Sequence, residues 1–541
     1  MVDTVTLGAV TCVFLGLTVY LSWYGYRSTR NNDQFLLGKN KANAILIALS
    51  YGATFLSTSA IVGFGGMAAK YGLSIVWLAV LCIIVGTIIA FLVFGKPTRR
   101  IGQKLGANTF ADLLGKRFRS HTIRTVVALI VLIGMPIYCA AVLIGGVNFV
   151  SVTMGIEKNL ALLGLSLIVV LYVTYGGVIA VMYNDALQAG IMFVGMFIIL
   201  IFTFTQLGGV ENAFVGLSNL WEMKAADFGS LVASGMNGWT EAPSFGTPIW
   251  MTVVTTLLMG VGIGSLAQPQ LAVRFMSAKD DKTLNKSIAI GAVFIFLVLG
   301  TAFTIGPLSN LFFFNEHGLV STEYITNSDM IIPTYVNELF ANTTLGDLFI
   351  SVFILALVCA TISTMAALLH TMGSSAGYDL WGQIKERMGE KLESGDVKSL
   401  GASRIATMIM MIVVVVMAYM MPSNIIARAT TIFMGLTAAA LLPTFAYGLY
   451  TKKPNVLAAE ISIAVGAISW TIWAFFIERT TSGMMGVCEA LFGVPYLFEG
   501  TIGYVDPLVI GLPLSAITLV LCILALKKVN KGYIDDPLLD A

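Results

Sequence analysis

Long apolar segments, separated by shorter polar connectors, fill the chain from its first residues to its last. An α-helix needs about 20 mostly apolar residues to cross about 30 Å of hydrocarbon. Segments of this length recur, and we expect an all-α polytopic membrane protein with about thirteen transmembrane helices. The expected spans are residues 5–27, 41–70, 74–96, 121–150, 158–176, 181–207, 248–273, 285–310, 345–378, 403–421, 424–450, 455–477 and 507–528.

One of these spans is unusually polar. Residues 49–66 read LSYGATFLSTSAIVGFGG, with six hydroxyl side chains and a glycine-rich end. Backbone groups in hydrocarbon need partners inside the protein, so a helix that is prone to unwind is tolerated only where it lines a cavity or a binding site. The pattern therefore indicates a membrane transporter.

The composition agrees with a membrane protein. Hydrophobic residues make up 57% of the 541 residues and charged residues 11%, with a mean hydropathy of +0.87. These values leave no room for a separate soluble catalytic domain. The six cysteines show no disulfide or zinc spacing, and no cluster of histidine, cysteine or paired carboxylates indicates an active site. We expect no enzyme activity, no nucleic-acid partner and no obligatory protein partner.

Lysine and arginine concentrate in alternate connectors, which indicates that these connectors face the cytoplasm. This pattern places the N-terminus outside and the C-terminus inside a cell (plasma) membrane. Arg117 and Arg274 count among the basic residues of these connectors. The basic connectors are residues 27–41, 96–119, 274–286, 385–398, 452–453 and 527–531.

The spans divide into two units of five helices. An odd number of spans in a unit forces a second copy of it into the opposite orientation. We expect a first inverted repeat over residues 41–207 and a second over 248–450, joined by an extracellular connector over 208–247. Residues 1–40 would add one helix and a cytoplasmic loop, and residues 451–541 would add the last helices and a cytoplasmic tail.

Both repeats begin with a helix that contains a glycine cluster, GFGG at residues 63–66 and GVGIG at residues 260–264. Paired interruptions at matching positions indicate a substrate site near the middle of the bilayer. The alternative is that these glycines serve close helix crossings, where glycine is common in membrane proteins.

The third helix of the second repeat reads LALVCATISTMAALLH, with Ala360, Ser363 and Thr364 on one side. Two adjacent hydroxyls beside a small residue suit a hard monovalent cation, which prefers oxygen ligands. Backbone carbonyls freed by unwinding within residues 49–66 could complete such a site. Alternatively, Ser363 and Thr364 donate to carbonyls one turn earlier, as such residues often do in membrane helices.

Motifs in four of these regions resemble the sodium/solute symporter family, which includes proline, pantothenate, sugar, sialic acid and acetate carriers. The resemblance covers about residues 5–530, with the motifs in family order. It implies the inverted-repeat fold of the leucine-transporter type, Na+ coupling and alternating access. The motifs are SYGATFLSTSAIVG at 50–63, YGGVIAVMYNDALQ at 175–188, QPQLAVRFM at 268–276, and ATIST at 360–364 followed by YDL at 378–380.

The resemblance also implies a sodium site. Asp185 matches the family aspartate near the cytoplasmic exit of sodium, although it could instead cap the helix that follows. The implied sodium ligands are the backbone carbonyls of Ala53, Leu56 and Ala360 and the hydroxyls of Ser363 and Thr364.

Two departures from the family pattern matter. Sialic acid carriers with a second sodium site have two serines where this chain has Ala366 and Ala367, which favours one sodium ion per cycle. Proline carriers have a tryptophan and a tyrosine where this chain has Val261 and Ser265, which argues against proline as the substrate.

The solute is expected to bind between the two broken helices. Arg428 would suit an anionic solute such as a short carboxylate or an amino acid, although its side chain could instead extend to the outer headgroups. Ser57 and Tyr138 match residues near the solute in related carriers. The candidate solute-binding residues are Ser57, Tyr138, Val261, Ser265, Gln268 and Arg428.

Together these features predict a sodium-coupled symporter that imports a small organic solute, with a carboxylate or an amino acid favoured. Its partners would be the solute, the sodium ion and the lipid bilayer. The alternative function is a membrane-embedded solute sensor that shares the symporter fold.

Overall fold

The structure is a computed structural model that describes residues 4–29, 32–38, 42–341, 346–388, 397–422, 424–529 and 531–535. Within these ranges the regular structure is helical, apart from two isolated bridges that join Ala42 to Ala278 and Asn455 to Tyr533. The helices that cross the molecule are α1 (Thr4–Ser28), α3 (Ala44–Phe55) with α4 (Phe64–Tyr71), α5 (Val76–Ile83) with η4 (Ile84–Gly95), α8 (His121–Met154), α9 (Lys158–Gln206), η6 (Met251–Met259) with α14 (Pro269–Ser277), α15 (Asp281–His317), α18 (Gly346–Ser374), α20 (Val397–Met420), α21 (Ile426–Tyr450), α22 (Val456–Phe476) and α25 (Pro507–Lys528).

Eleven helical stretches of the described chain are long and apolar enough to cross a membrane. Two of them must be divided, because at about 1.5 Å per residue the 49-residue α9 alone would be about 74 Å long. Gly177 (φ 61°, ψ −162°) divides α9 into two crossings. Gly72 (φ 77°) separates α4 from α5 within the stretch Ser59–Lys104. Each division adds one crossing, so eleven stretches become thirteen crossings, as predicted.

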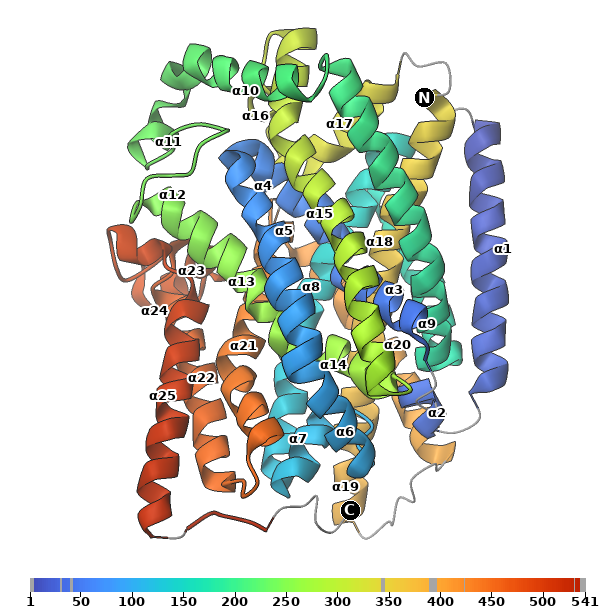
Figure 1. Cartoon of the computed structure of the whole chain (residues 1–541), viewed down its shortest axis with the longest axis vertical. Helices are drawn as coiled ribbons and strands as arrows, with labels where there is room; N and C mark the ends of the chain where they lie inside the picture. The colour runs from blue at the N-terminus through green and yellow to red at the C-terminus, as the bar shows by residue number, and fades with distance from the viewer. Residues whose placement is uncertain are drawn as a thin grey trace.

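The helices form one bundle with flanking elements at both edges (Figure 1). α18 packs against α8 and α9 in the centre. α1 lies at one edge against α9, and α22 and α25 pair at the opposite edge against α21. Shorter helices cover the two ends: α10 (Val210–Lys224), α11 (Gly229–Ala233), α16 (Ser321–Tyr324) and α17 (Ile331–Phe340) lie at the top of the view, and α6 (Lys96–Lys104), α7 (Phe110–Phe118) and α19 (Trp381–Arg387) at the bottom.

The first repeat begins with a broken helix, but the break lies before the glycines that were expected to cause it. α3 ends at Phe55, and a π-helical segment, η2 (Ser59–Gly63), starts after three intervening residues. Gly63 and Gly66 are helical and lie at close contacts. A Cβ on Gly63 would lie 2.9 Å from the backbone nitrogen of Ala427, and one on Gly66 would overlap the Ser328 carbonyl. The close-crossing interpretation of these glycines is therefore correct.

The second repeat shows the same difference. Gly260 and Gly262 lie in the helical turn α13 (Gly260–Gly262), and Gly264 begins a 3₁₀ turn, η7 (Gly264–Ala267). The helix is interrupted at Gln268, whose backbone is extended (φ −80°, ψ 118°). Pro269 causes this interruption, since proline has no N–H and disfavours helical geometry at the preceding residue.

Gly177 separates two spans by adopting a backbone conformation that is essentially restricted to glycine. Gly177→Ala should destabilise the protein by about 1–3 kcal/mol, because alanine is strained in this conformation. A Cβ at this position would in addition lie 3.0 Å from the Phe35 backbone. Gly164→Ala in the same helix is the control, since a Cβ at Gly164 meets nothing within 4 Å. Thermal unfolding in detergent should show a lower midpoint for Gly177→Ala only. Equal midpoints for the two variants would contradict the conclusion that the division of α9 requires glycine at position 177.

Candidate functional site

The centre of the site is the break between α3 and η2. The backbone N–H of Leu56 donates to Gly52 (2.8 Å), which is the last bond of α3. Ser57 then starts the next segment, because its carbonyl accepts from Ala60 (2.9 Å) and its hydroxyl also accepts from the Ala60 N–H (3.3 Å). A serine that bonds to the backbone in this way competes with a continuous helix. The break leaves the last carbonyls of α3 without partners further along the same helix.

Hydroxyl groups of α18 bind these carbonyls. Ser363 Oγ donates to the carbonyls of Ala53 (3.0 Å) and Ala360 (3.3 Å). Thr364 Oγ1 lies 3.4 Å from the carbonyl of Ala53 and 3.3 Å from that of Thr54. The structure thus brings together Ala53, Ala360, Ser363 and Thr364, and the fifth predicted ligand, Leu56, lies at the break itself. All five are buried.

This cluster presents neutral oxygens from two helices within a few ångströms of one another. A hard monovalent cation needs such ligands, and hydroxyl groups can turn from donating to a carbonyl to coordinating an ion. The residues present therefore fit sodium. Ser363 bonds both to its own helix and across to α3, so the two interpretations of its hydroxyl that the sequence allowed are not exclusive.

Asp185 forms a fully buried ion pair with Arg274. Arg274 Nη2 lies 3.0 Å from Asp185 Oδ2, and both side chains have 0% exposure. The same carboxylate oxygen accepts from Ser50 (2.7 Å) and lies 3.4 Å from the Thr54 hydroxyl. Asp185 lies inside α9, so the alternative that it caps the start of a helix is wrong. Its second oxygen, Oδ1, has no hydrogen-bond partner among the described residues.

The predicted place of Arg274 in a cytoplasmic connector is wrong. Arg274 lies in α14 and donates to Ser50 (3.2 Å) and Thr54 (3.0 Å) of α3. Thr54 therefore bonds to Arg274 through its hydroxyl, while its carbonyl faces Thr364. The available signal was that Arg274 stands inside an apolar run, LAVRFM.

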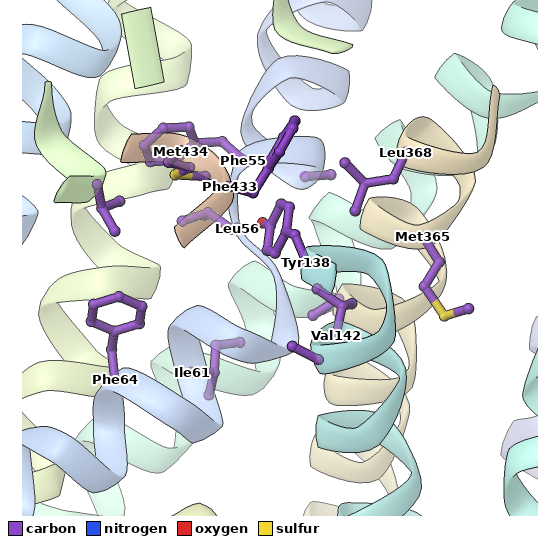
Figure 2. Close-up of a cluster of buried hydrophobic side chains, with 14 of the residues drawn as sticks. Phe55, Leu56, Ile61, Phe64, Tyr138, Val142, Met365, Leu368, Phe433 and Met434 are labelled. Atoms are coloured by element: carbon purple, nitrogen blue, oxygen red, sulfur yellow. The ribbon is translucent and has the colours of Figure 1, made fainter. Parts of the chain in front are cut away.

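A small cavity lies beside the break. Ser57, Tyr138 and Val261 line it, which brings together three of the six candidate solute-binding residues. Figure 2 shows Phe55, Leu56, Tyr138 and Phe433 around this region. Its volume of about 20 Å³ holds no more than a water-sized molecule, so a solute could enter only after the walls move apart. The full lining is Phe55, Ser57, Ala60, Phe64, Leu78, Cys82, Tyr138, Val261, Leu299, Phe303, Thr430 and Met434.

Ser265 and Gln268 do not line this central cavity. Ser265 donates to the Gly262 carbonyl (2.9 Å) of its own helix. The Gln268 amide donates to the Gly264 carbonyl (2.9 Å) and to Thr437 Oγ1 (2.7 Å). Gln268 thus supports the break in the second repeat and joins it to α21.

Arg428 lines a second, larger cavity of about 590 Å³. Its guanidinium pairs with Glu478 and donates to Thr481 (2.9 and 3.1 Å), with Asp506 at 3.9 Å. Burial raises the pKa of Glu478, but the Arg428 charge and the Thr481 bonds outweigh burial and lower that pKa below its ordinary value. Arg428 therefore has a carboxylate partner within the protein and does not reach the central cavity.

The opposite end of the bundle is closed by another buried network. Asp379 of the π-helical segment η9 (Ser375–Leu380) accepts from Thr109 (2.8 and 2.9 Å) and from Arg124 Nε (2.9 Å). These residues join α18 to the start of α7 and to α8.

Comparison with known proteins identifies the family to which this chain belongs. The family model described as "Sodium:solute symporter family" matches residues 35–466. The chain is 23% identical over 501 residues to the sodium/proline symporter of Escherichia coli, covering 91% of each chain. It is 27% identical over 469 residues to the sodium/pantothenate symporter of Haemophilus influenzae, covering 85% of this chain and 90% of that one.

Among solved structures, a Na+-coupled sialic acid symporter in a substrate-bound outward-open state matches with a TM-score of 0.74 and 16% identity, covering 98% of both chains. This likeness shows that the fold is the inverted-repeat fold of the leucine-transporter type. Because the family model spans most of the chain, this protein belongs to the sodium:solute symporter family and is a multi-pass membrane transporter rather than an enzyme.

Proposed function

We propose that the protein imports a small organic solute together with sodium by alternating access. The observation that carries this proposal is the cluster of neutral oxygens at the α3 break, where Ser363 and Thr364 contact the carbonyls of Ala53 and Thr54. A cation bound there would connect α3 of the first repeat to α18 of the second. Its arrival and departure would therefore change how the two repeats are held together.

The proposed sodium ligands are the carbonyls of Ala53, Leu56 and Ala360 and the hydroxyls of Ser363 and Thr364. Ala366 and Ala367, one turn further along α18, offer no hydroxyl for a second ion, which favours one sodium per cycle. One ion crossing about 100 mV releases about 2.3 kcal/mol. A tenfold sodium gradient adds about 1.4 kcal/mol, and together these sustain a solute gradient of several hundredfold.

The solute is proposed to bind in the central cavity once it has opened. No charged side chain lines this cavity among the described residues, whereas Ser57, Tyr138 and Thr430 supply hydroxyls beside aromatic and aliphatic groups. A buried charge needs a partner, so this lining favours an amino acid, whose own charges compensate each other, or a small carboxylate paired with sodium. A sugar would find few partners for its many hydroxyls.

Orientation and repeat boundaries belong to the same proposal. We place the N-terminus outside and the C-terminus in the cytoplasm, from the basic residues of alternate connectors. The first repeat would span residues 41–207 and the second 248–450. The relatives are a sodium/proline symporter and a sodium/pantothenate symporter, which favours transport over a sensor role.

Solute exchange in proteoliposomes tests the function. Sodium should stimulate counterflow of at least one small amino acid or short monocarboxylate, and glucose should give none. Paired sodium and solute fluxes should have a ratio near one. A panel of these solutes with no sodium-stimulated exchange would contradict the proposal, and a ratio near two would contradict the single-ion site.

Thr364→Ala should raise the sodium concentration for half-maximal uptake about tenfold, because loss of one ligand of about 1.4 kcal/mol has that effect. Ser363→Ala should act in the same direction. Thr371→Ala is the matched control, since Thr371 lies on the same helix and donates to the Ala367 carbonyl (2.8 Å). Unchanged sodium dependence in both Thr364→Ala and Ser363→Ala would place the site elsewhere.

Asp185→Asn should reduce sodium-driven uptake severely, since it removes a charge on the proposed sodium path. It also leaves Arg274 unpaired, and breaking a buried ion pair costs about 3–5 kcal/mol of stability. The double variant Asp185→Asn/Arg274→Gln separates these effects. Its thermal midpoint should recover while its uptake stays low. Full recovery of uptake in the double variant would show that the pair is only structural.

A further inference from the structure

The two cavities described above share two helices. Met67 and Lys70 of α4 and Ala427 of α21 line the larger outer cavity. Phe64 of α4 and Thr430 of α21 line the central one. The cavities are therefore successive parts of one path between α4 with η2 and the first turns of α21.

The first turn of α21 closes this path against η2. Ser59 Oγ donates to the Ile426 carbonyl (3.0 Å) and lies 2.5 Å from Thr430 Oγ1. Gly63 faces the Ala427 nitrogen so closely that a Cβ would lie 2.9 Å from it. Movement of this turn away from η2 would join the two cavities.

A short loop helix, η8 (Ser328–Met330), holds the start of α21 in this closed position. The buried carboxylate of Asp329 faces the backbone N–H groups of Asn424, Ile425 and Ile426, and Asp329 lines the outer cavity together with Asn424. In return, the Asn424 side chain accepts from the N–H (2.8 Å) and hydroxyl (3.1 Å) of Ser328. Asn424 has a positive φ of 62°, which is uncommon for a residue other than glycine and turns the chain so that these groups meet.

This reciprocal contact, which we call the Asp329 clasp, has the chemistry of a helix cap supplied by another segment. The first N–H groups of a helix have no partner inside it, and a negative charge at this end is favourable. The Asp329 carboxylate, from a different part of the chain, brings a negative charge to this end of α21. Ser328 also touches α4 at Gly66, so η8 contacts both walls of the path.

The first turns of α21 are also held from the other side. Arg428 pairs with Glu478 and binds Thr481 of α23 (Arg479–Met485). Bonds between two charged groups are stronger than those of a carboxylate with neutral N–H groups. When the path opens, α21 should therefore stay with α23 and separate from η8.

We propose that Asp329 is a positioning residue that closes the outer wall of the solute site, and that release of its clasp joins the outer and central cavities. The proposal concerns the same transport path as the proposed function, but it rests on contacts that involve neither the sodium ligands nor a bound solute. The clasp sets the balance between closed and open outer states.

Cys82 offers a direct readout, because it is buried and lines the central cavity. The experiment uses the full chain with the other five cysteines replaced by serine: Cys12, Cys139, Cys359, Cys488 and Cys522. A membrane-impermeant methanethiosulfonate reagent is applied to right-side-out or inverted vesicles, and the rate of Cys82 modification is measured. This rate follows the population in which the path is open.

Asp329→Asn should raise the modification rate about tenfold from the face that carries η8, with no rise from the other face. Asn424→Gly should act in the same direction, since glycine tolerates the positive φ but removes the acceptor for Ser328. Asp227→Asn is the matched control, because Asp227 lines the same outer cavity but is 52% exposed and pairs with Lys224. It should change the rate less than twofold.

Three results would overturn the proposal: unchanged rates in both folded clasp variants, an equal rise in Asp227→Asn, or a rise only from the face that carries α7. The assay needs neither the identity of the solute nor sodium coupling. If counterflow is absent but Cys82 responds as expected, the proposed function fails and the clasp stands. If counterflow is present and the rates do not respond, only the clasp fails.

Discussion

The rest of the structure depends on one constraint, the need of every backbone polar group in the bilayer for a partner inside the protein. The chain breaks α3 between Phe55 and Ser59, in the middle of the bundle, and so exposes carbonyls that a continuous helix would satisfy. Ser363 and Thr364 of α18 are the partners that make this break tolerable. The same oxygens form the candidate cation site, so the structural need and the proposed function coincide in one place.

A related constraint applies to buried charged side chains, because each needs a partner of opposite charge inside the protein. Asp185 pairs with Arg274 near the proposed sodium site. Arg428 pairs with Glu478 on one side of the central cavity, and Arg124 pairs with Asp379 on the other. Each pair joins helices that are far apart in sequence. Charge compensation therefore holds together elements that would have to move in the proposed alternating access.

Much of the fold could be predicted from the sequence, because span length and hydropathy act locally. The thirteen crossings follow from apolar segments, and the hydroxyl-rich stretch at residues 49–66 marks the break. The glycines of residues 63–66 could not be interpreted in this way, since both an unwound turn and a close crossing favour glycine. Only the neighbours of Gly63 and Gly66 in space, Ala427 and Ser328, decide between them.

The candidate site, too, could be predicted only where its features are local in the sequence and not where they depend on contacts between distant residues. Adjacent hydroxyls on one helix are visible in the sequence, and the grouping of Ala53, Ala360, Ser363 and Thr364 followed from them and from family motifs. Arg274 and Glu478 could not be placed, because whether a charge lies in a connector or in the interior depends on its partner, and each partner is distant in sequence. α21 shows the consequence most fully. Its first turns meet Glu478, Ser59 and Asp329 from three separate segments, and Thr437 further along binds Gln268. A helix with contacts to both breaks and to the loop that contains η8 is well placed to relate the state of the central cavity to that of the cavity beside η8.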